Sequence, residues 1–501
     1  MKSKKNVMLI EFSDHVTNHI FKEMQNFINI HTCISNKPDI YSKKNFPNTV
    51  VFHNHECLNG RNLKVDKIKN YFDTLSLLER EILIFLIKRQ NINYIDKDNI
   101  KKFVNYLFSG WSHYIKENKI DFLIFYLNPH LVYSYVIYII AKRKKLKVKI
   151  LENNKYLNLY YFIDKIENYP IKLKNLSNSN KIIPKHIKNY INQFRNRKKI
   201  PPHSIGEDNN FGEYLRIAYR TFVRVFFKEE KILEYFFKKQ KNSFFNYTNF
   251  FPTNIKSRHS KFKDNFLYFK VYNISNKLKK NYEGNSISID KLNKQTKYIF
   301  FSANFQPEKT TCPDGLNYFN QLEVLKILNN FCNKNKSFKI LYKEHPAQFY
   351  YKKFGFLVKN EDFYKKLFKL KNIIFLSLET NIVDVIKLSK ITTTVTGEAG
   401  LQSLLLGKPS VVFGYPWYKN FKYIVSINKN KDFNKNLIKR LEKSKISEKK
   451  IYQEFYKLID SETIRLIFDN KSWELKNIKN SYKMKKYLNK NFIFFKKNLV
   501  R

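Results

Sequence analysis

The sequence has little cysteine and glycine for its length: 4 Cys and 11 Gly among 501 residues. The cysteines, Cys33, Cys57, Cys312 and Cys332, are widely separated. Such spacing argues against a disulfide framework and is typical of a protein in a reducing cytosol. A zinc site is also disfavoured, because residues 53–57 (HNHEC) have metal-ligand spacing but no second cluster completes a ligand set.

Acidic residues are also scarce. The chain has 42 Asp and Glu against 94 Lys and Arg, which gives a formal net charge of +52 and a pI of about 9.8. Lys, Asn, Ile, Phe and Tyr are abundant while Gly is rare, a set that an A- and T-rich genome encodes by default, so we expect the charge to be spread over solvated faces. Nucleic-acid binding would need clustered basic residues with aromatic side chains that stack on bases, or a known binding module, and neither is evident in the sequence. A basic surface should still attract anionic nucleotides and anionic membranes.

Long apolar runs are missing as well. The first run ends at Glu11, which is too early for a signal peptide. The tract at 120–140 has the length and basic flank of a membrane span, but Asp121 and residues 128–130 (NPH) interrupt it. We interpret it as a strand–helix–strand unit over 120–127, 131–144 and 147–151. We therefore expect a cytoplasmic protein, with peripheral contact to the inner face of a membrane as an alternative.

The most informative stretch is 391–418, ITTTVTGEAGLQSLLLGKPSVVFGYPWY. Its pattern predicts a buried strand, a turn at Thr396-Gly397, a helix that ends at Gly407 and a second strand. The predicted ranges are 391–395 for the first strand, 398–406 for the helix and 410–413 for the second strand. A glycine at such a turn lets the backbone approach a ligand closely, and the helix start offers N–H groups to a phosphate. The alternative is an ordinary packing unit.

Two other predicted strands also end in polar residues. Residues 338–346 read FKILYKEHP, so Lys343, Glu344 and His345 follow a strand. Residues 297–305 form another strand, followed by Gln306-Pro307-Glu308. Ligands gather beyond the carboxyl ends of strands in open α/β sheets, so these residues are site candidates. The alternative for the first group is a solvated Lys–Glu pair beside a satisfied histidine.

The three segments together resemble the capsule polysaccharide biosynthesis family, which includes bacterial Kdo-type glycosyltransferases. The resembling pieces are FFSANFQPEKTTCPDG, LYKEHPAQF and TVTGEAGLQSLLLGKPSVVFGYPWY, in about the C-terminal third of the chain. The resemblance implies an α/β protein of GT-B type, with two Rossmann-like domains and helical insertions. We place the N-terminal domain with its insertion, on the acceptor side, at 1–290, and the nucleotide-sugar-binding domain at 291–501. The linker is expected at 272–296, and the terminal helices are expected to cross back.

The resemblance also implies roles for particular residues. The candidate acid/base or nucleophile is Glu308, with Glu344 as second choice, and His345 would neutralise the leaving phosphate. The expected substrate-binding residues are Gln306, Lys343, Thr396, Gly397, Glu398 and Gln402. Gln402-Ser403 stand where many GT-B proteins carry Glu-Ala, so Gln402 would meet the ribose hydroxyls as a neutral group. No metal or cofactor is expected, because Lys343, His345 and the helix start can supply the positive charge.

The predicted function is transfer of a sugar from a nucleotide-sugar donor to a growing capsular or surface polysaccharide. The expected acceptor is a polysaccharide or a lipid-linked saccharide, and nucleic acid is not expected as a partner. One alternative is a polyol-phosphate transferase of the teichoic-acid type, although such enzymes carry Asp-Tyr-Ser-Ser where this chain has Thr-Gly-Glu-Ala. Another is a catalytically inactive partner in capsule assembly or export. The basic, aromatic segment 213–239 is predicted to be either a core helix or an interfacial helix on a membrane.

Overall fold

The chain divides into two compact units. The first comprises 1–87, 94–187 and 453–501, and the second 88–93 and 188–452. The computed structural model describes residues 4–60, 63–65, 67–90, 97–154, 159–170, 172–173, 188–189, 191–192, 272–306, 308–350, 355, 358–444, 446–461, 464–465 and 482–500. The segment 213–239 lies outside these residues. Each unit is described by itself.

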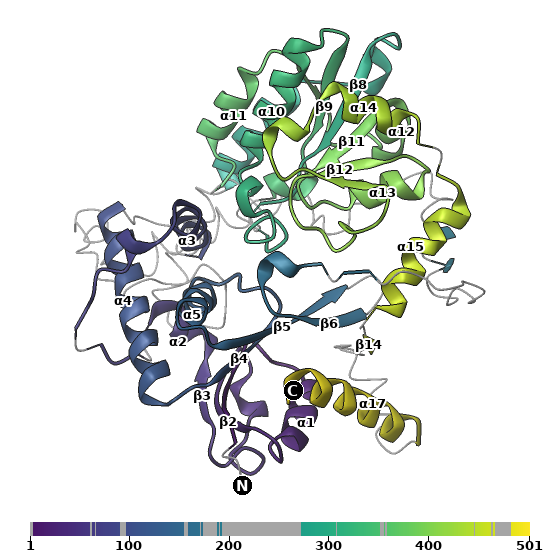
Figure 1. Ribbon diagram of the computed structural model, residues 1–501. Helices are drawn as coiled ribbons and strands as arrows, with labels where there is room; N and C mark the ends of the chain where they lie inside the picture. Colours follow the sequence, from purple (N-terminus) through teal and green to yellow (C-terminus); the bar gives the residue numbers. More distant parts are fainter. Residues whose placement is uncertain are drawn as a thin grey trace, which may run out of the picture. The chain divides into compact units, whose positions relative to one another are not determined.

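The first unit is built on a seven-stranded sheet of order β14-β6-β5-β4-β1-β2-β3 (Figure 1). Its strands are β1 (Asn6–Ile10), β2 (Asn29–Ser35), β3 (Val50–His53), β4 (Phe122–Tyr126), β5 (Lys147–Asn154), β6 (Leu159–Ile163) and β14 (Ile464–Arg465). The strands β1 to β5 run parallel, while β6 and β14 add antiparallel pairs at one edge. The order β3-β2-β1-β4-β5 is that of a doubly wound sheet, which changes winding direction between β1 and β4.

Helices cover this sheet. They are α1 (His15–Met24), α2 (Asn54–Asn59), α3 (Leu77–Gln90), α4 (Lys97–Glu117), α5 (Val132–Arg143) and α17 (Tyr482–Leu499). The terminal helix α17 packs against α1, where the rings of Phe21 and Phe495 meet edge to face at 5.7 Å. The tract 120–140 is the predicted strand–helix unit, β4 followed by α5. Within the described ranges, no helix is long and apolar enough to cross a membrane.

The second unit has an all-parallel sheet of order β13-β12-β11-β8-β9-β10-β7. Its strands are β7 (Ser286–Ile287), β8 (Lys297–Ser302), β9 (Phe338–Lys343), β10 (Ile373–Leu376), β11 (Ile391–Thr394), β12 (Ser410–Val412) and β13 (Ile424–Ser426). The winding direction changes here between β8 and β11. Two doubly wound sheets in one chain confirm the predicted fold class, α/β with two Rossmann-like parts.

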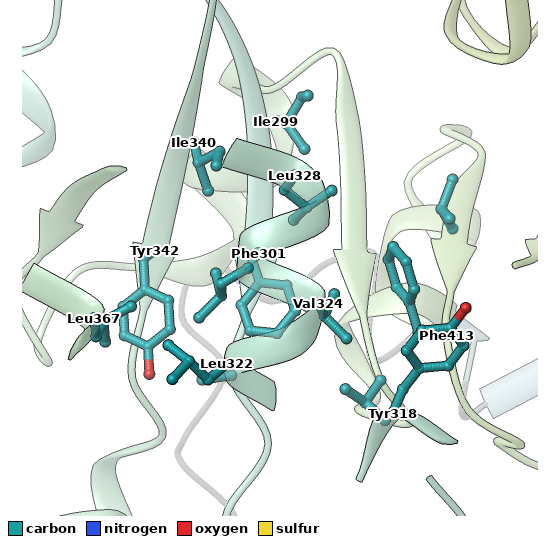
Figure 2. Close-up of a cluster of buried hydrophobic side chains, with 14 of the residues drawn as sticks. Ile299, Phe301, Tyr318, Leu322, Val324, Leu328, Ile340, Tyr342, Leu367 and Phe413 are labelled. Carbon is teal, nitrogen blue, oxygen red and sulfur yellow. The ribbon is translucent and has the colours of Figure 1, made fainter. Parts of the chain in front are cut away.

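Both faces of the second sheet are buried. Ile299 and Phe301 point into one core cluster, whereas Tyr298 and Phe300 belong to the opposite cluster. Figure 2 shows Phe301 and Tyr342 among the apolar side chains of the first cluster. The covering helices are α10 (Gln321–Lys334), α11 (Glu361–Phe368), α12 (Ile382–Leu388), α13 (Ala399–Leu405) and α14 (Lys435–Glu442). The next helix along the chain, α15 (Glu448–Asp460), belongs to this unit up to residue 452 and to the first unit from residue 453. Burial on both faces explains why these strands read as nearly continuous apolar runs.

The predicted linker at 272–296 is wrong. Residues 272–284 are helical, and β7 extends the sheet by pairing with β10. Ser275, Leu278 and Tyr282 are buried, and this spacing of three and four residues forms one helix face. The many Asn and Lys residues between them occupy the other positions, which is why the segment resembles a loop in sequence.

Candidate active site

The loops that follow β8 and β11 meet where the second sheet changes winding direction. Asn304, just after β8, is 6% exposed and links the two loops. Its Nδ2 donates to Thr396 Oγ1 at 3.0 Å, and its Oδ1 accepts from Thr394 Oγ1 at 3.0 Å. In doubly wound sheets ligands bind in the crevice at this point. Asn304 lies in the segment FFSANFQPEKTTCPDG, but no role for it was predicted from the sequence.

The Gly397 turn requires a glycine. Its N–H donates to Thr394 Oγ1 at 3.1 Å, and its carbonyl accepts a hydrogen bond from the Tyr418 hydroxyl. A Cβ on Gly397 would lie 2.7 Å from Thr394 Oγ1 and 3.3 Å from Asn304 Nδ2. The turn therefore lies against the polar link between β8 and β11, and its closeness leaves no room for a side chain.

The loop after β8 reaches the same turn. Thr396 Oγ1 donates to the carbonyl of Thr310 at 2.6 Å, and the Thr310 hydroxyl lies 3.2 Å from Glu308 Oε2. Glu308 is exposed. The structure thus brings Glu308 and Thr396 into one group of loops, with Thr310 between them.

Gln306 braces this loop. It is 1% exposed, and its side-chain Nε2 donates to the Phe319 carbonyl at 2.6 Å. Its backbone N–H donates to Gln348 Oε1 at 3.0 Å, and its carbonyl accepts from Gln348 Nε2 at 3.1 Å. Gln348 belongs to the short helix η6 (Pro346–Phe349) that follows β9. Gln306 therefore ties the β8 exit to the β9 exit.

Glu344 lies at the centre of a buried polar network. Its carboxylate accepts from Lys359 Nζ at 2.8 Å, from the hydroxyls of Tyr342 and Tyr364 at 2.6 and 3.0 Å, and from the backbone N–H of His345 at 2.7 Å. The side chains of Glu344 and Lys359 are both 0% exposed. Burial lowers the pKa of Lys359, and the Glu344 charge opposes that shift. Four donors occupy this carboxylate, an arrangement that suits an anchor for the His345 backbone.

His345 is half-buried beside the ring of Phe305, at 5.7 Å between centroids. Burial lowers the pKa of its imidazole to about 4. Its Nδ1 accepts from the Ala347 N–H at 3.2 Å, which places the proton of the neutral ring on Nε2. At neutral pH His345 thus offers a hydrogen-bond donor rather than a positive charge.

Two lysines near these loops differ in what they bind. Lys343 is 8% exposed and donates to the Leu378 carbonyl at 2.8 Å, and burial lowers its pKa to about 8. Lys419 is half-buried over the Tyr415 ring, 3.2 Å from its centroid, and burial lowers its pKa to about 8 as well. No ion pair joins Lys419 to the described part of the chain. Lys419 was not among the predicted site residues, because no local pattern shows that its ammonium lies over the Tyr415 ring.

The remaining candidates lie on α13. Glu398 is half-buried at its N-cap and accepts the Gln402 N–H at 2.8 Å through its carbonyl. Gln402 is 9% exposed. The predicted contact of Gln402 with a ribose stays a prediction. Among the described residues, no three His, Cys, Asp or Glu side chains gather into a set that could hold a metal ion.

Residues 177–459, more than half of the chain, match the family model of the capsule polysaccharide biosynthesis protein. The chain belongs to this family. No curated protein matches it.

Several solved structures are similar to the chain at low identity. The Thermosulfurimonas dismutans KpsC β-Kdo 2,7 transferase is 13% identical with a TM-score of 0.27, over 81% of this chain and 98% of that one. The β-Kdo 2,4 transferase of the same KpsC is 12% identical with a TM-score of 0.22, over 37% of this chain and 55% of that one. The chain thus spans about half the length of that second structure. Methanocaldococcus jannaschii UDP-GlcNAc 2-epimerase in complex with UDP-GlcNAc and UDP is 10% identical with a TM-score of 0.24, over 91% of this chain and 99% of that one.

Proposed function

We propose that this capsule-family protein is a glycosyltransferase that moves a sugar from a nucleotide-sugar donor to a growing capsular or surface polysaccharide. The observation that carries the proposal is the link from Asn304 to Thr396 and Gly397 at the change of winding in the second sheet. A backbone turn without a side chain at that point suits the close approach of a donor phosphate. Membership of the family supports the substrate class.

The leaving phosphate would be bound by several groups of different character. The Gly397 turn would contact it through the backbone, and His345 would donate from Nε2. Lys419 would supply positive charge, because its ammonium lies over the ring of Tyr415, and the backbone N–H of Tyr415 donates to the carbonyl of Asp314 in the loop after β8. Donors fixed before the reaction stabilise the developing negative charge at low reorganisation cost. These groups can bind a phosphate without a metal ion.

Glu308 is the proposed acid/base or nucleophile. It is the exposed carboxylate of the loop that reaches Thr396, whereas the oxygens of Glu344 are engaged by Lys359, Tyr342 and Tyr364. Glu308→Gln should leave nucleotide affinity close to intact and lower turnover by about two orders of magnitude or more. Full turnover in this variant would remove Glu308 from the reaction.

Calorimetric titration with a panel of nucleoside mono- and diphosphates tests the donor site. Wild type should bind at least one of them, and His345→Ala should weaken binding about tenfold to a hundredfold, the range for a hydrogen bond to a charged group. The matched control is His113→Ala, since His113 is an exposed histidine of the first unit, paired with Glu117. Equal affinity of wild type and His345→Ala, with unchanged turnover, would contradict the assignment.

A location on the inner face of the bacterial inner membrane is part of the proposal. With its formal charge of +52, the protein should bind anionic vesicles in a salt-sensitive manner. Tight, sequence-specific DNA binding at physiological salt would instead contradict the enzyme proposal.

A further inference from the structure

Asn304, in the loop after β8, has a side-chain hydrogen-bond donor that the described part of the chain leaves unused. Its amide nitrogen Nδ2 carries two hydrogens. One of them goes to Thr396 Oγ1 at 3.0 Å, and no other described residue accepts from Nδ2. Asn304 is 6% exposed, so this donor has little contact with water. A buried donor without an acceptor is destabilising, and such groups are often found at functional sites.

The orientation of the Asn304 amide follows from its neighbours. The hydroxyl of Thr396 donates to the Thr310 carbonyl at 2.6 Å, so its single hydrogen is used and it can only accept from Asn304. The amide atom that faces Thr396 must therefore be the nitrogen. On the other side of the amide, Oδ1 accepts from Thr394 Oγ1 at 3.0 Å. The hydrogen-bond network thus fixes which end of the side chain carries the unused hydrogen.

The amide offers a ligand a donor and no acceptor. Oδ1 of Asn304 accepts from Thr394 Oγ1 at 3.0 Å and from Thr396 N at 3.4 Å, so both of its lone pairs are used. A ligand atom that meets this side chain must then be an acceptor. The oxygens of an ionised phosphate only accept, whereas a sugar hydroxyl also brings a hydrogen that needs an acceptor of its own.

The backbone of Asn304 is held in place by two buried side chains. Gln321 Oε1 accepts from the Asn304 N–H at 2.8 Å, and Gln321 Nε2 donates to the Asn304 carbonyl at 2.9 Å. The same carbonyl accepts from Lys359 Nζ at 3.0 Å. Gln321 and Lys359 are both 0% exposed. A donor that is fixed before a ligand arrives loses little conformational freedom when the ligand binds.

The unused donor lies next to the Gly397 turn. A Cβ on Gly397 would be 3.3 Å from Asn304 Nδ2, so the amide nitrogen lies against the side of this glycine that carries no side chain. The Gly397 N–H is already used, because it donates to Thr394 Oγ1 at 3.1 Å. A ligand that approaches the Gly397 backbone on this side therefore meets the Asn304 amide as its hydrogen-bond donor.

Asn372 shows how a buried asparagine is satisfied elsewhere in the same unit. It lies just before β10, at the amino edge of the sheet, and is 7% exposed. Its Nδ2 donates to Asn329 Oδ1 at 3.2 Å and to Asn333 Oδ1 at 2.7 Å, and its Oδ1 accepts from Lys339 Nζ at 2.9 Å. All polar atoms of this side chain are paired, whereas Asn304, at the opposite edge, keeps one hydrogen without an acceptor among the described residues.

We propose that Asn304 binds a phosphate oxygen of the nucleotide-sugar donor through the second hydrogen of Nδ2. The inference rests on the glycosyltransferase function proposed above, and it adds to the donor site a residue for which the sequence predicted no role. Gln321 and Lys359 hold the Asn304 backbone while the phosphate binds beside the Gly397 turn. A hydrogen bond to a charged group contributes more than one between neutral groups, so the loss of this donor should be measurable as a change in affinity.

The test compares Asn304→Ala and Asn304→Asp with Asn372→Ala, the matched buried control, all in the full-length protein. Affinity for UDP, GDP, ADP and CMP is measured by calorimetry, and affinity for the corresponding nucleosides by ligand-detected NMR. The nucleosides carry the base and the ribose without the phosphate, so they separate a phosphate contact from a general loosening of the loops. Melting temperatures show whether each variant is folded.

Asn304→Ala should weaken binding of each nucleotide that wild type binds by about tenfold to a hundredfold, the range for a hydrogen bond to a charged group. Asn304→Asp should weaken it at least as much, because its carboxylate repels the phosphate. Nucleoside affinity should stay within a few-fold of wild type in both variants. Asn372→Ala should melt at a lower temperature, because it leaves buried partners unpaired, but it should bind every ligand as wild type does.

Nucleotide affinity of Asn304→Ala within a few-fold of wild type would overturn the inference and leave the glycosyltransferase proposal intact. An equal loss of affinity for nucleotides and nucleosides would also overturn it, because Asn304 would then support the loops without contacting the phosphate. A wild type that binds none of these nucleotides would instead overturn the proposed donor site, and the inference with it.

Discussion

Replacing Glu344 with glutamine tests the buried network behind His345. Glu344 and Lys359 are both 0% exposed and 2.8 Å apart, so Glu344→Gln leaves the Lys359 ammonium buried without its counter-charge. The amide also offers one acceptor oxygen where the carboxylate has two, which receive four donors in all. Breaking a buried ion pair from one side costs about 3–5 kcal/mol. For a unit of this size the melting temperature should fall by roughly 10 °C.

Thermal and urea unfolding, followed by circular dichroism, measure this cost. In the double variant Glu344→Gln/Lys359→Met no buried charge is left alone, so it should be more stable than Glu344→Gln alone. Lys366→Met is the control, because Lys366 and Asp362 form an exposed pair at 2.6 Å, and it should cost less than about 1 kcal/mol. A Glu344→Gln protein within about 1 kcal/mol of wild type would show that Glu344 does not stabilise the buried Lys359 ammonium.

Three further predictions concern the site loops. Gly397→Ala should weaken nucleotide binding about tenfold or more, because its Cβ would lie 2.7 Å from Thr394 Oγ1. The control is Gly284→Ala, because a Cβ at Gly284 meets nothing within 4 Å. In the same titration this variant should bind nucleotide as wild type does. Nucleotide affinity should fall up to about tenfold between pH 7 and 9 as Lys419, with its pKa lowered to about 8, loses its proton, and Lys419→Gln should remove this dependence. Burial lowers the pKa of His345 from 6.5 to about 4, so the unfolded chain binds a proton at this imidazole more tightly than the folded protein does. His345 should therefore contribute about 3 kcal/mol to the free energy of unfolding above about pH 6.5, and this contribution should be lost as the pH falls to 4. Urea unfolding of His345→Gln should lack this pH-dependent loss.

The sequence predicts the strands β8, β9, β11 and β12 of the second unit because they are buried on both faces. Runs such as KYIFFS fit interior strands, whose alternate side chains enter two opposite apolar clusters. The strand β2, NIHTCIS, is not evident from its sequence, because it contains several polar residues although it lies inside a sheet. The helix at 272–284 was taken for a linker, because its Asn and Lys residues hide a narrow buried stripe.

The sequence predicts only some of the residues that form the candidate site. His345, Glu308 and Gly397 could be predicted as candidates because each follows a predicted strand, and loops at the carboxyl edge of a parallel sheet lie close together. The pairing of Glu344 with Lys359 depends on where the chain returns after η6, which no local pattern encodes. The link through Asn304 is also a long-range contact, since Thr396 lies 92 residues further along the chain.

As a glycosyltransferase, the protein should transfer a sugar from a nucleotide donor to a saccharide. Mass spectrometry of products, after incubation of the purified protein with a panel of nucleotide sugars and saccharide acceptors, measures this transfer. The expected product is an acceptor heavier by one sugar residue, together with an equal amount of free nucleotide. An acceptor that gains a polyol phosphate, or an unchanged acceptor with every donor although nucleotide binds, would contradict this function.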